Sequence, residues 1–146
     1  MAQLSPHFSL EEMTHSDVAV RQGWDNTPNE AELANLTRLS AFLEQVKEVL
    51  GGKPIMINSA YRSKQVNDSV GSKDTSQHRL GCAADIRVPG MTPDEVTKAV
   101  IASSLQFDQV IREFNSWTHI SVPNHESDKP RRQALIIDKG GVRYYS

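Results

Sequence analysis

Residues 76–85 read Ser-Gln-His-Arg-Leu-Gly-Cys-Ala-Ala-Asp, and the rest of the chain can be organised around them. His78, expected in a polar loop, and Asp85, expected at the start of a strand, both have side chains that bind metal ions. Small residues between them, Gly81 among them, let the chain turn back so that both can reach one ion. A later segment, Trp-Thr-His-Ile-Ser, adds His119. Two histidines and one carboxylate are the ligand set of a zinc ion that keeps one coordination position open.

Each of these residues also has an ordinary interpretation. A single histidine in a strand more often packs in the core or lies at the surface, and a single aspartate more often caps an element or pairs with a cation. Cys82 is the only cysteine, which excludes an internal disulfide and a structural zinc site built from cysteines. Cys82 could bind the metal, but a small buried side chain is the simpler interpretation. The residues alone leave a metal site and ordinary packing both open.

Helix starts are clearly marked. A hydroxyl residue followed three positions later by glutamate predicts N-caps at Ser9, Thr27 and Thr92, and proline follows both threonines directly. Apolar residues at helical spacing over residues 33–50 predict a long amphipathic helix that ends at a glycine pair. A shorter helix is expected after Thr92, and another over residues 63–70.

Strands are predicted mainly late in the chain. Apolar or alternating runs predict them at residues 54–58, 84–88, 107–113, 117–122, 133–137 and 142–145, the last as an edge strand. Helices grouped early and strands late, with short hairpin-like links, favour an antiparallel sheet over alternating parallel units. We therefore predict an α+β fold, an antiparallel sheet flanked by helices, in a single domain over residues 1–146.

The composition narrows the possible partners. Sixteen basic against 18 acidic residues give a net charge of −2, so no positive field favours nucleic acid or an anionic membrane. No apolar run approaches the length of a membrane span. The first residues lack the basic start and apolar run of a secretory signal, so we expect cytoplasmic synthesis and, for a target outside the cell, release by another protein. We expect a monomer.

Several motifs together resemble a known family. Residues 76–85 resemble the Ser-x-His-x-x-Gly-x-Ala-x-Asp signature of the zinc D-Ala-D-Ala carboxypeptidases, and residues 117–119 resemble the Trp-x-His motif seen in part of that family. Residues 59–63, Ser-Ala-Tyr-Arg-Ser, match its Ser-x-Tyr-Arg-Ser element. Residues 5–13 and 107–111 resemble the branch common in bacteriophage and prophage genomes, which is endolysin-like. The resemblance covers nearly the whole chain.

The resemblance implies a site as well as a fold like that of hedgehog and D-Ala-D-Ala peptidases. It implies that Zn²⁺ is held by His78, Asp85 and His119, where it would acidify a water molecule and polarise the scissile carbonyl. Arg62 matches the family's arginine that stabilises the oxyanion, a role that suits the fixed donors of a guanidinium. The alternative for Arg62 is a solvated surface charge.

The catalytic base departs from the family pattern. Better-known members have an acid three residues before the last histidine, but that position here is Ser116. Glu113 is the nearest carboxylate. A three-residue loop at 114–116 would put Glu113 opposite Trp117 and on the same sheet face as His119, with roughly 7 Å between β-carbons. A two-residue loop would put Glu113 on the other face, and a plain charge at a strand end is the alternative.

Ser76, Tyr61 and Trp117 are the candidate substrate-binding residues. Ser76 could instead shape its loop, and a tryptophan in a strand more often packs in the core. Asp108 and Gln109 are candidates for orienting a histidine ligand, with a turn role for Asp108 as the alternative.

The resemblance and these site residues together predict a zinc metallopeptidase that acts on the stem peptides of bacterial peptidoglycan. We expect this enzyme to be a phage or prophage lysis enzyme. The cleaved bond stays open among the terminal D-Ala-D-Ala bond, the L-Ala-D-Glu bond and a cross-link. A catalytically silent relative that binds the cell wall, or a phage structural protein with the same fold, is the alternative that Ser116 favours. An unrelated protein that packs these residues in its core would bind no zinc.

Overall fold

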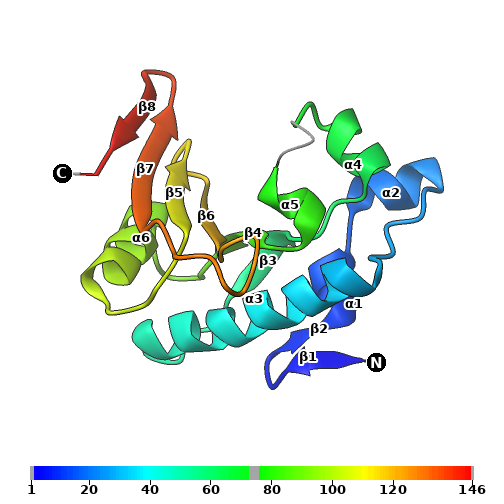
Figure 1. Cartoon of the computed structure of the whole chain (residues 1–146). Coiled ribbons are helices and arrows are strands. Elements are labelled where there is room, and N and C mark those ends of the chain that lie inside the picture. Colours follow the sequence, from blue (N-terminus) through cyan, green and yellow to red (C-terminus); the bar gives the residue numbers. More distant parts are fainter. Residues whose placement is uncertain (1, 73–75, 146) are drawn as a thin grey trace.

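The computed structural model describes residues 2–72 and 76–145 and contains a six-stranded sheet packed against helices (Figure 1). The strands lie in the order β3-β4-β6-β5-β7-β8. Their bounds are β3 Met56–Ser59, β4 Ala83–Arg87, β5 Gln109–Glu113, β6 Trp117–Ser121, β7 Gln133–Asp138 and β8 Gly141–Tyr144. The predicted α+β class and each of the predicted strands are confirmed, with ends shifted by only one or two residues.

The helices begin mostly where the caps predict. They are α1 Leu10–Thr14, α2 Asp17–Gln22, α3 Glu30–Val49, α4 Lys64–Ser69, α5 Gln77–Leu80 and α6 Pro93–Ala102. The hydroxyls of Ser9, Ser63 and Thr92 each accept a hydrogen bond from the backbone N–H three residues on, which confirms these caps. Within the described residues, no helix is both long and apolar enough to cross a membrane.

The predicted cap at Thr27 is wrong by two residues. Asn29 caps α3 instead, and it forms a reciprocal capping box with Glu32. The Thr27 hydroxyl donates to the Asp25 carboxylate at 2.5 Å. An asparagine amide oxygen caps as well as a hydroxyl does. Thr27 and Asn29 were therefore both possible caps of this helix.

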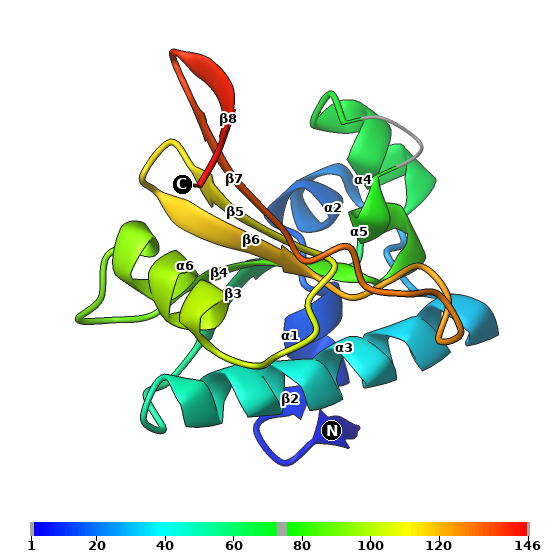
Figure 2. The same ribbon diagram turned by 60° about the vertical axis from the view of Figure 1, so that its left-hand side comes forward.

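The sheet departs from the predicted antiparallel arrangement at one pair. Four neighbouring pairs are antiparallel, whereas β5 and β7 are parallel. Residues 122–132 carry the chain from β6 to the far side of β5, so β7 runs in the same direction as β5 (Figure 2). This connection has nearly the dozen residues that a parallel crossover needs, although it contains no helix.

Alternation along the strands separates two faces of the sheet. One face belongs to the buried core and contains Ala84, Ile86, Val110 and Ile120. Figure 2 shows α3 and α6 along the lower side of the strands, and α3 adds its own buried stripe of Leu36, Leu39, Leu43 and Val46. The opposite face, here called the site face, contains Asp85, Ile111, Glu113 and His119.

The N-terminal segment contains elements that were not predicted. β1 Gln3–Ser5 pairs with β2 Phe8–Ser9 in a small separate sheet. Phe8 and Met13 are fully buried in the core, so this segment is fixed by packing. Strands of two or three residues are too short to show a hydrophobic period, which is why the sequence did not reveal them.

Candidate metal centre

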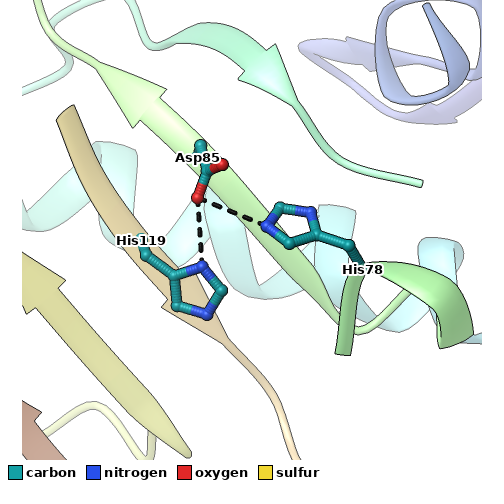
Figure 3. Close-up of side chains that lie close together, drawn as sticks. All are labelled: His78, Asp85 and His119. Carbon is teal, nitrogen blue, oxygen red and sulfur yellow. Dashed lines mark hydrogen bonds and ion pairs between the residues drawn. The ribbon is translucent and has the colours of Figure 1, made fainter. Parts of the chain in front are cut away.

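Three side chains meet on the site face, where β4, β6 and α5 come together (Figure 3). Asp85 of β4 is the direct cross-strand partner of His119 of β6, which puts both side chains on one face. His78 comes from α5, and its ring lies edge-on to that of His119 with 5.1 Å between centroids. His78, Asp85 and His119 are only 3%, 6% and 8% exposed. The three predicted ligands are therefore brought together and held away from water.

The distances between these side chains fit a metal ion. Asp85 Oδ1 lies 3.3 Å from His78 Nε2 and 3.0 Å from His119 Nδ1. All three potential ligand atoms lie within 4.8 Å of one another. Zinc bonds of about 2.0–2.1 Å in a tetrahedron place ligand atoms about 3.3 Å apart. Cys82 is buried in the core instead, in agreement with its simpler interpretation.

The surroundings of His78 direct one ring nitrogen to the cluster. Nδ1 lies 2.7 Å from the carbonyl oxygen of Ala60, so Nδ1 donates its proton there and Nε2 keeps the lone pair that faces Asp85. Burial lowers the pKa of His78, against the attraction of Asp85, and favours the neutral ring. A neutral imidazole is the form that binds metal. The Ala60 carbonyl had no sequence signal, because it is a backbone group.

The short helix α5 orients His78. The Ser76 hydroxyl accepts a hydrogen bond from the His78 backbone N–H at 3.2 Å, and Gly81 ends the helix with a positive φ of 81°. A β-carbon at Gly81 would lie 2.7 Å from the carbonyl oxygen of Glu32, so α5 can approach α3 this closely only with glycine there. The expected loop at His78 is thus a helical turn, whereas the expected turn at Gly81 is confirmed.

The Asp85 carboxylate supplies the negative charge of the cluster. Burial would raise the pKa of Asp85, but the two histidines outweigh burial and hold the pKa well below its usual range, so the carboxylate is ionised. Arg62 Nη2 lies 3.4 Å from the second carboxylate oxygen. A carboxylate and two imidazoles that converge in this way could hold a metal ion.

Arg62 lies beside the cluster, as predicted. Its Nε donates to the hydroxyl of Ser59 at 3.2 Å, and its side chain is 16% exposed. Burial lowers the pKa of Arg62, while the carboxylates of Asp85 and Glu113 oppose that change, and a guanidinium stays charged in proteins. Ser59 was missed from the sequence. It pairs with Asp85 across β3 and β4, and its position as the first residue of the 59–63 motif was the available signal.

The loop between β5 and β6 has the three residues that the prediction required. Glu113 pairs with Trp117 across the hairpin. Phe114 and Asn115 adopt positive φ angles of 51° and 55°, and the Ser116 N–H donates to the Glu113 carbonyl at 2.9 Å. This register puts Glu113 on the site face.

Glu113 therefore lies next to the cluster. Its Oε1 is 3.9 Å from His119 Nδ1. Burial and the negative charge of Asp85 raise the pKa of the Glu113 carboxyl, although His119, Trp117 and Arg62 act to lower it. A carboxylate whose pKa is raised accepts a proton more readily, which suits a general base. Ser116, at the usual position of the acid, is exposed in the loop.

The three candidate substrate-binding residues lie in different settings. Tyr61 is 3% exposed and its hydroxyl donates to Glu32 at 2.9 Å, so its position in the core does not support the predicted substrate contact. Ser76 is engaged as the cap of α5. Trp117 is half-buried on the site face beside Glu113, and its buried indole Nε1 lowers the pKa of the Glu113 carboxyl. Of the three, Trp117 shares a sheet face with Glu113 and His119.

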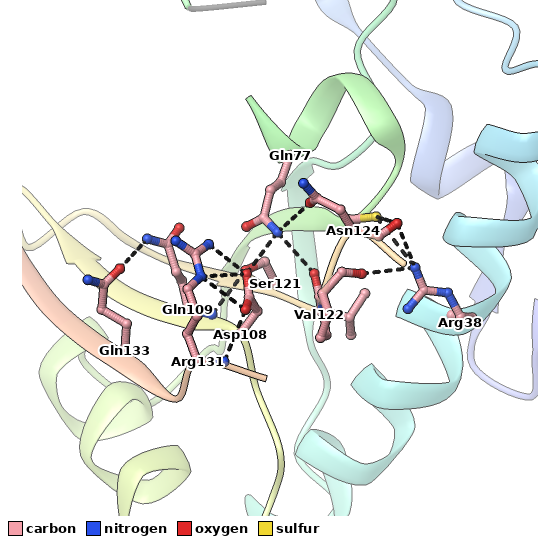
Figure 4. A network of polar contacts seen from close by, with 11 residues as sticks. Arg38, Gln77, Asp108, Gln109, Ser121, Val122, Asn124, Arg131 and Gln133 are labelled. Atoms are coloured by element: carbon pink, nitrogen blue, oxygen red, sulfur yellow. Dashed lines mark hydrogen bonds and ion pairs between the residues drawn. The ribbon is translucent and has the colours of Figure 1, made fainter. Parts of the chain in front are cut away.

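Asp108 and Gln109 bond elsewhere, so their expected role behind a histidine ligand is wrong (Figure 4). Asp108 accepts hydrogen bonds of 2.6–3.1 Å from the backbone N–H, Nε and Nη2 of Arg131. Gln77 Nε2 also donates to Asp108, at 3.0 Å. Gln109 Nε2 donates to Gln133 at 2.6 Å. This network ties residue 77, the first of α5, to the start of β5.

The comparison with protein families agrees with the geometry. Residues 6–121, most of the chain, match the family model described as Peptidase M15. The chain belongs to the peptidase M15 family. A comparison with curated proteins found no match to this chain. Membership of the peptidase M15 family confirms the family resemblance and supports a peptidase, whereas the phage-type branch stays a prediction.

The peptidase M15 match contains all the residues of the cluster and its neighbours. His78, Asp85, His119, Arg62 and Glu113 lie inside it, and it ends at the last residue of β6. β7 and β8 lie outside the matched residues.

Proposed function

We propose that this protein is a zinc metallopeptidase, one domain over residues 1–146, that hydrolyses a peptide bond of bacterial peptidoglycan. The observation that carries the proposal is the buried cluster of His78, Asp85 and His119, with Glu113 3.9 Å from a ligand nitrogen on one side and Arg62 3.4 Å from Asp85 on the other. Membership of the peptidase M15 family supports it.

His78, Asp85 and His119 would hold the zinc ion. Their buried positions, the neutral His78 ring and the ionised Asp85 carboxylate fit such an ion. When bound, zinc supplies Lewis acidity, which polarises a carbonyl and makes a water molecule more acidic. The Ala60 carbonyl keeps His78 in the required tautomer.

The neighbouring side chains supply the catalytic base, the donor to the oxyanion and a substrate contact. Glu113 takes the proton of the attacking water, because its carboxylate lies on the site face with a raised pKa. Arg62 stabilises the negative charge that develops on the carbonyl oxygen, and Ser59 fixes its guanidinium. Trp117 lines the same face and offers its ring to substrate.

The biological setting belongs to the same proposal. Residues 5–13 and 107–111 resemble the phage-type branch of the family, which supports a monomeric phage or prophage lysis enzyme that reaches the cell wall after release. The substrate is then a stem peptide, cut at the D-Ala-D-Ala bond, at the L-Ala-D-Glu bond or at a cross-link.

The test is incubation of purified peptidoglycan with zinc-loaded protein, with and without a chelator, followed by mass spectrometry of the released fragments. We expect cleavage that the chelator abolishes and zinc restores, and new termini that identify the bond. Ser116, at the place of the usual acid, favours a catalytically silent wall-binding protein as the second candidate. Bound zinc without cleavage of any wall type would support that candidate.

A further inference from the structure

The site face continues from the metal cluster to the outer edge of the sheet. Cross-strand pairs form one row, which contains Asp85, His119, Ile111, Leu135 and Tyr144. Three strand spacings of about 4.8 Å separate His119 from Tyr144, a distance of about 14 Å. An extended peptide covers that distance with about four residues. The row therefore leads from the cluster to a position within reach of the same substrate molecule.

The outer end of this row is apolar and exposed. Tyr144 is 71% exposed and Val142 63%, whereas Leu135, the next residue inward, is 8% exposed. The neighbouring Tyr145 faces the other side, where its hydroxyl donates to Asp94 of α6 at 2.9 Å. Val142 and Tyr144 thus extend the site face without a covering element, and exposed apolar side chains beside a site are available for ligand contact.

The ring of Tyr144 is held in place although it is exposed. Gln133 Nε2 donates to the Tyr144 hydroxyl at 3.2 Å, and Gln109 Nε2 donates to Gln133 Oε1 at 2.6 Å (Figure 4 shows the two amides). A positioned ring loses less freedom when a ligand binds. The phenol and both amides are neutral, and each amide has donors and acceptors beyond these bonds.

We infer that Tyr144, Val142, Gln109 and Gln133, together called the outer platform, bind a sugar ring of the peptidoglycan glycan while the attached peptide lies at the metal cluster. The inference rests on the proposed function, which supplies the substrate. A sugar ring has an apolar C–H face that packs on an aromatic ring, and its hydroxyl and acetamido groups bond with neutral amides. The charged carboxylates of a stem peptide would find no counter-charge among these four side chains.

The test compares two substrates, a free stem peptide and the same peptide attached to its disaccharide. Tyr144→Ala should raise KM for the sugar-bearing substrate about tenfold and leave kcat, and the free peptide, unchanged. Tyr144→Phe should have a smaller effect, because the ring remains but its bond to Gln133 is lost. Arg143→Ala is the matched control: it is exposed on the same strand, on the opposite face, and should change neither substrate.

Equal losses on both substrates, or no loss on either, would overturn the outer platform. A wild-type protein that cleaves neither substrate nor intact peptidoglycan would overturn the proposed function instead. Calorimetry on zinc-loaded Glu113→Gln protein, with and without Tyr144→Ala, separates the two cases. Tighter binding of the sugar-bearing peptide that depends on Tyr144 supports the platform, and equal affinity for both ligands contradicts it.

Discussion

Two buried aspartates, Asp85 and Asp108, lie at the same sheet but have opposite surroundings. Both are at most 6% exposed. Asp108 accepts hydrogen bonds from Arg131 and Gln77, including a short one of 2.6 Å from the Arg131 guanidinium. Asp85 faces two imidazoles at 3.0–3.3 Å, and its nearest cation, Arg62, is 3.4 Å away.

The difference indicates how a structural carboxylate can be distinguished from a candidate metal ligand. A buried charge is stable when a partner compensates it. Burial would raise the pKa of Asp108, but hydrogen bonds from Arg131 and Gln77 outweigh burial and lower it. Asp108 is thus held by Arg131 and Gln77, whereas Asp85 lies with two imidazoles in a cluster that could hold a metal ion.

The largest expected effect is at the cluster. His119→Ala should remove the zinc ion and lower peptidase activity by roughly 10³-fold or more, because both depend on one ligand set. Asp108→Asn should retain the metal. The zinc content of both variants after dialysis and their rates in the cleavage assay measure the two effects. Zinc lost from Asp108→Asn as well as from His119→Ala would remove the distinction between the cluster and Asp108.

Glu113→Gln separates metal binding from proton transfer. The amide keeps the shape of the side chain but cannot accept a proton, so the rate should fall about 10²–10⁴-fold with zinc content unchanged. Steady-state kinetics on metal-loaded protein measure the effect. Full activity in this variant would assign the base to another group.

Arg62→Ala tests the guanidinium that lies 3.4 Å from Asp85. We expect kcat to fall about 10²-fold, because one donor to the oxyanion is lost. The midpoint of thermal unfolding and the zinc content should be nearly unchanged. If the variant failed to fold, Arg62 would have the structural role that belongs to Arg131 in the other pair.

Asp108→Asn should have the smallest effect on peptidase activity, and it should lower the stability of the fold. We expect a loss of about 2 kcal/mol in the free energy of unfolding, since Arg131 is half-exposed and only part of a buried pair is broken. The folded-state pKa of Asp108 is lowered, so its contribution is complete above about pH 4 and disappears as pH falls through that pKa. Urea unfolding of chelator-treated proteins at several pH values should show the difference between wild type and variant shrinking in acid. A difference that does not depend on pH would contradict the ionised pair.

The sequence predicted local features better than long-range ones. The caps at Ser9 and Thr92 and the hairpin that orients Glu113 depend on neighbouring residues, and the structure confirms them. The convergence of His78, Asp85 and His119 was expected because motifs resembled a family, although their spacing alone favoured ordinary packing.

Contacts between distant segments were not predictable in this way. The parallel pairing of β5 and β7 depends on the path of residues 122–132, which contain no helix to indicate a crossover. The partner of Asp108 is Arg131, 23 residues away, and no local pattern links them. Tyr61 matched a motif, but its burial against Glu32 depends on how α3 packs.

The most direct measurement is the number of zinc ions bound per chain, by titration against a competing chelator, in wild type, Asp108→Asn and Asp85→Asn. If His78, Asp85 and His119 form the metal centre, wild type and Asp108→Asn should each bind one zinc tightly, and Asp85→Asn should bind none at the same chelator concentration. Equal zinc binding by Asp85→Asn, or no binding by the folded wild-type protein, would contradict the metal centre.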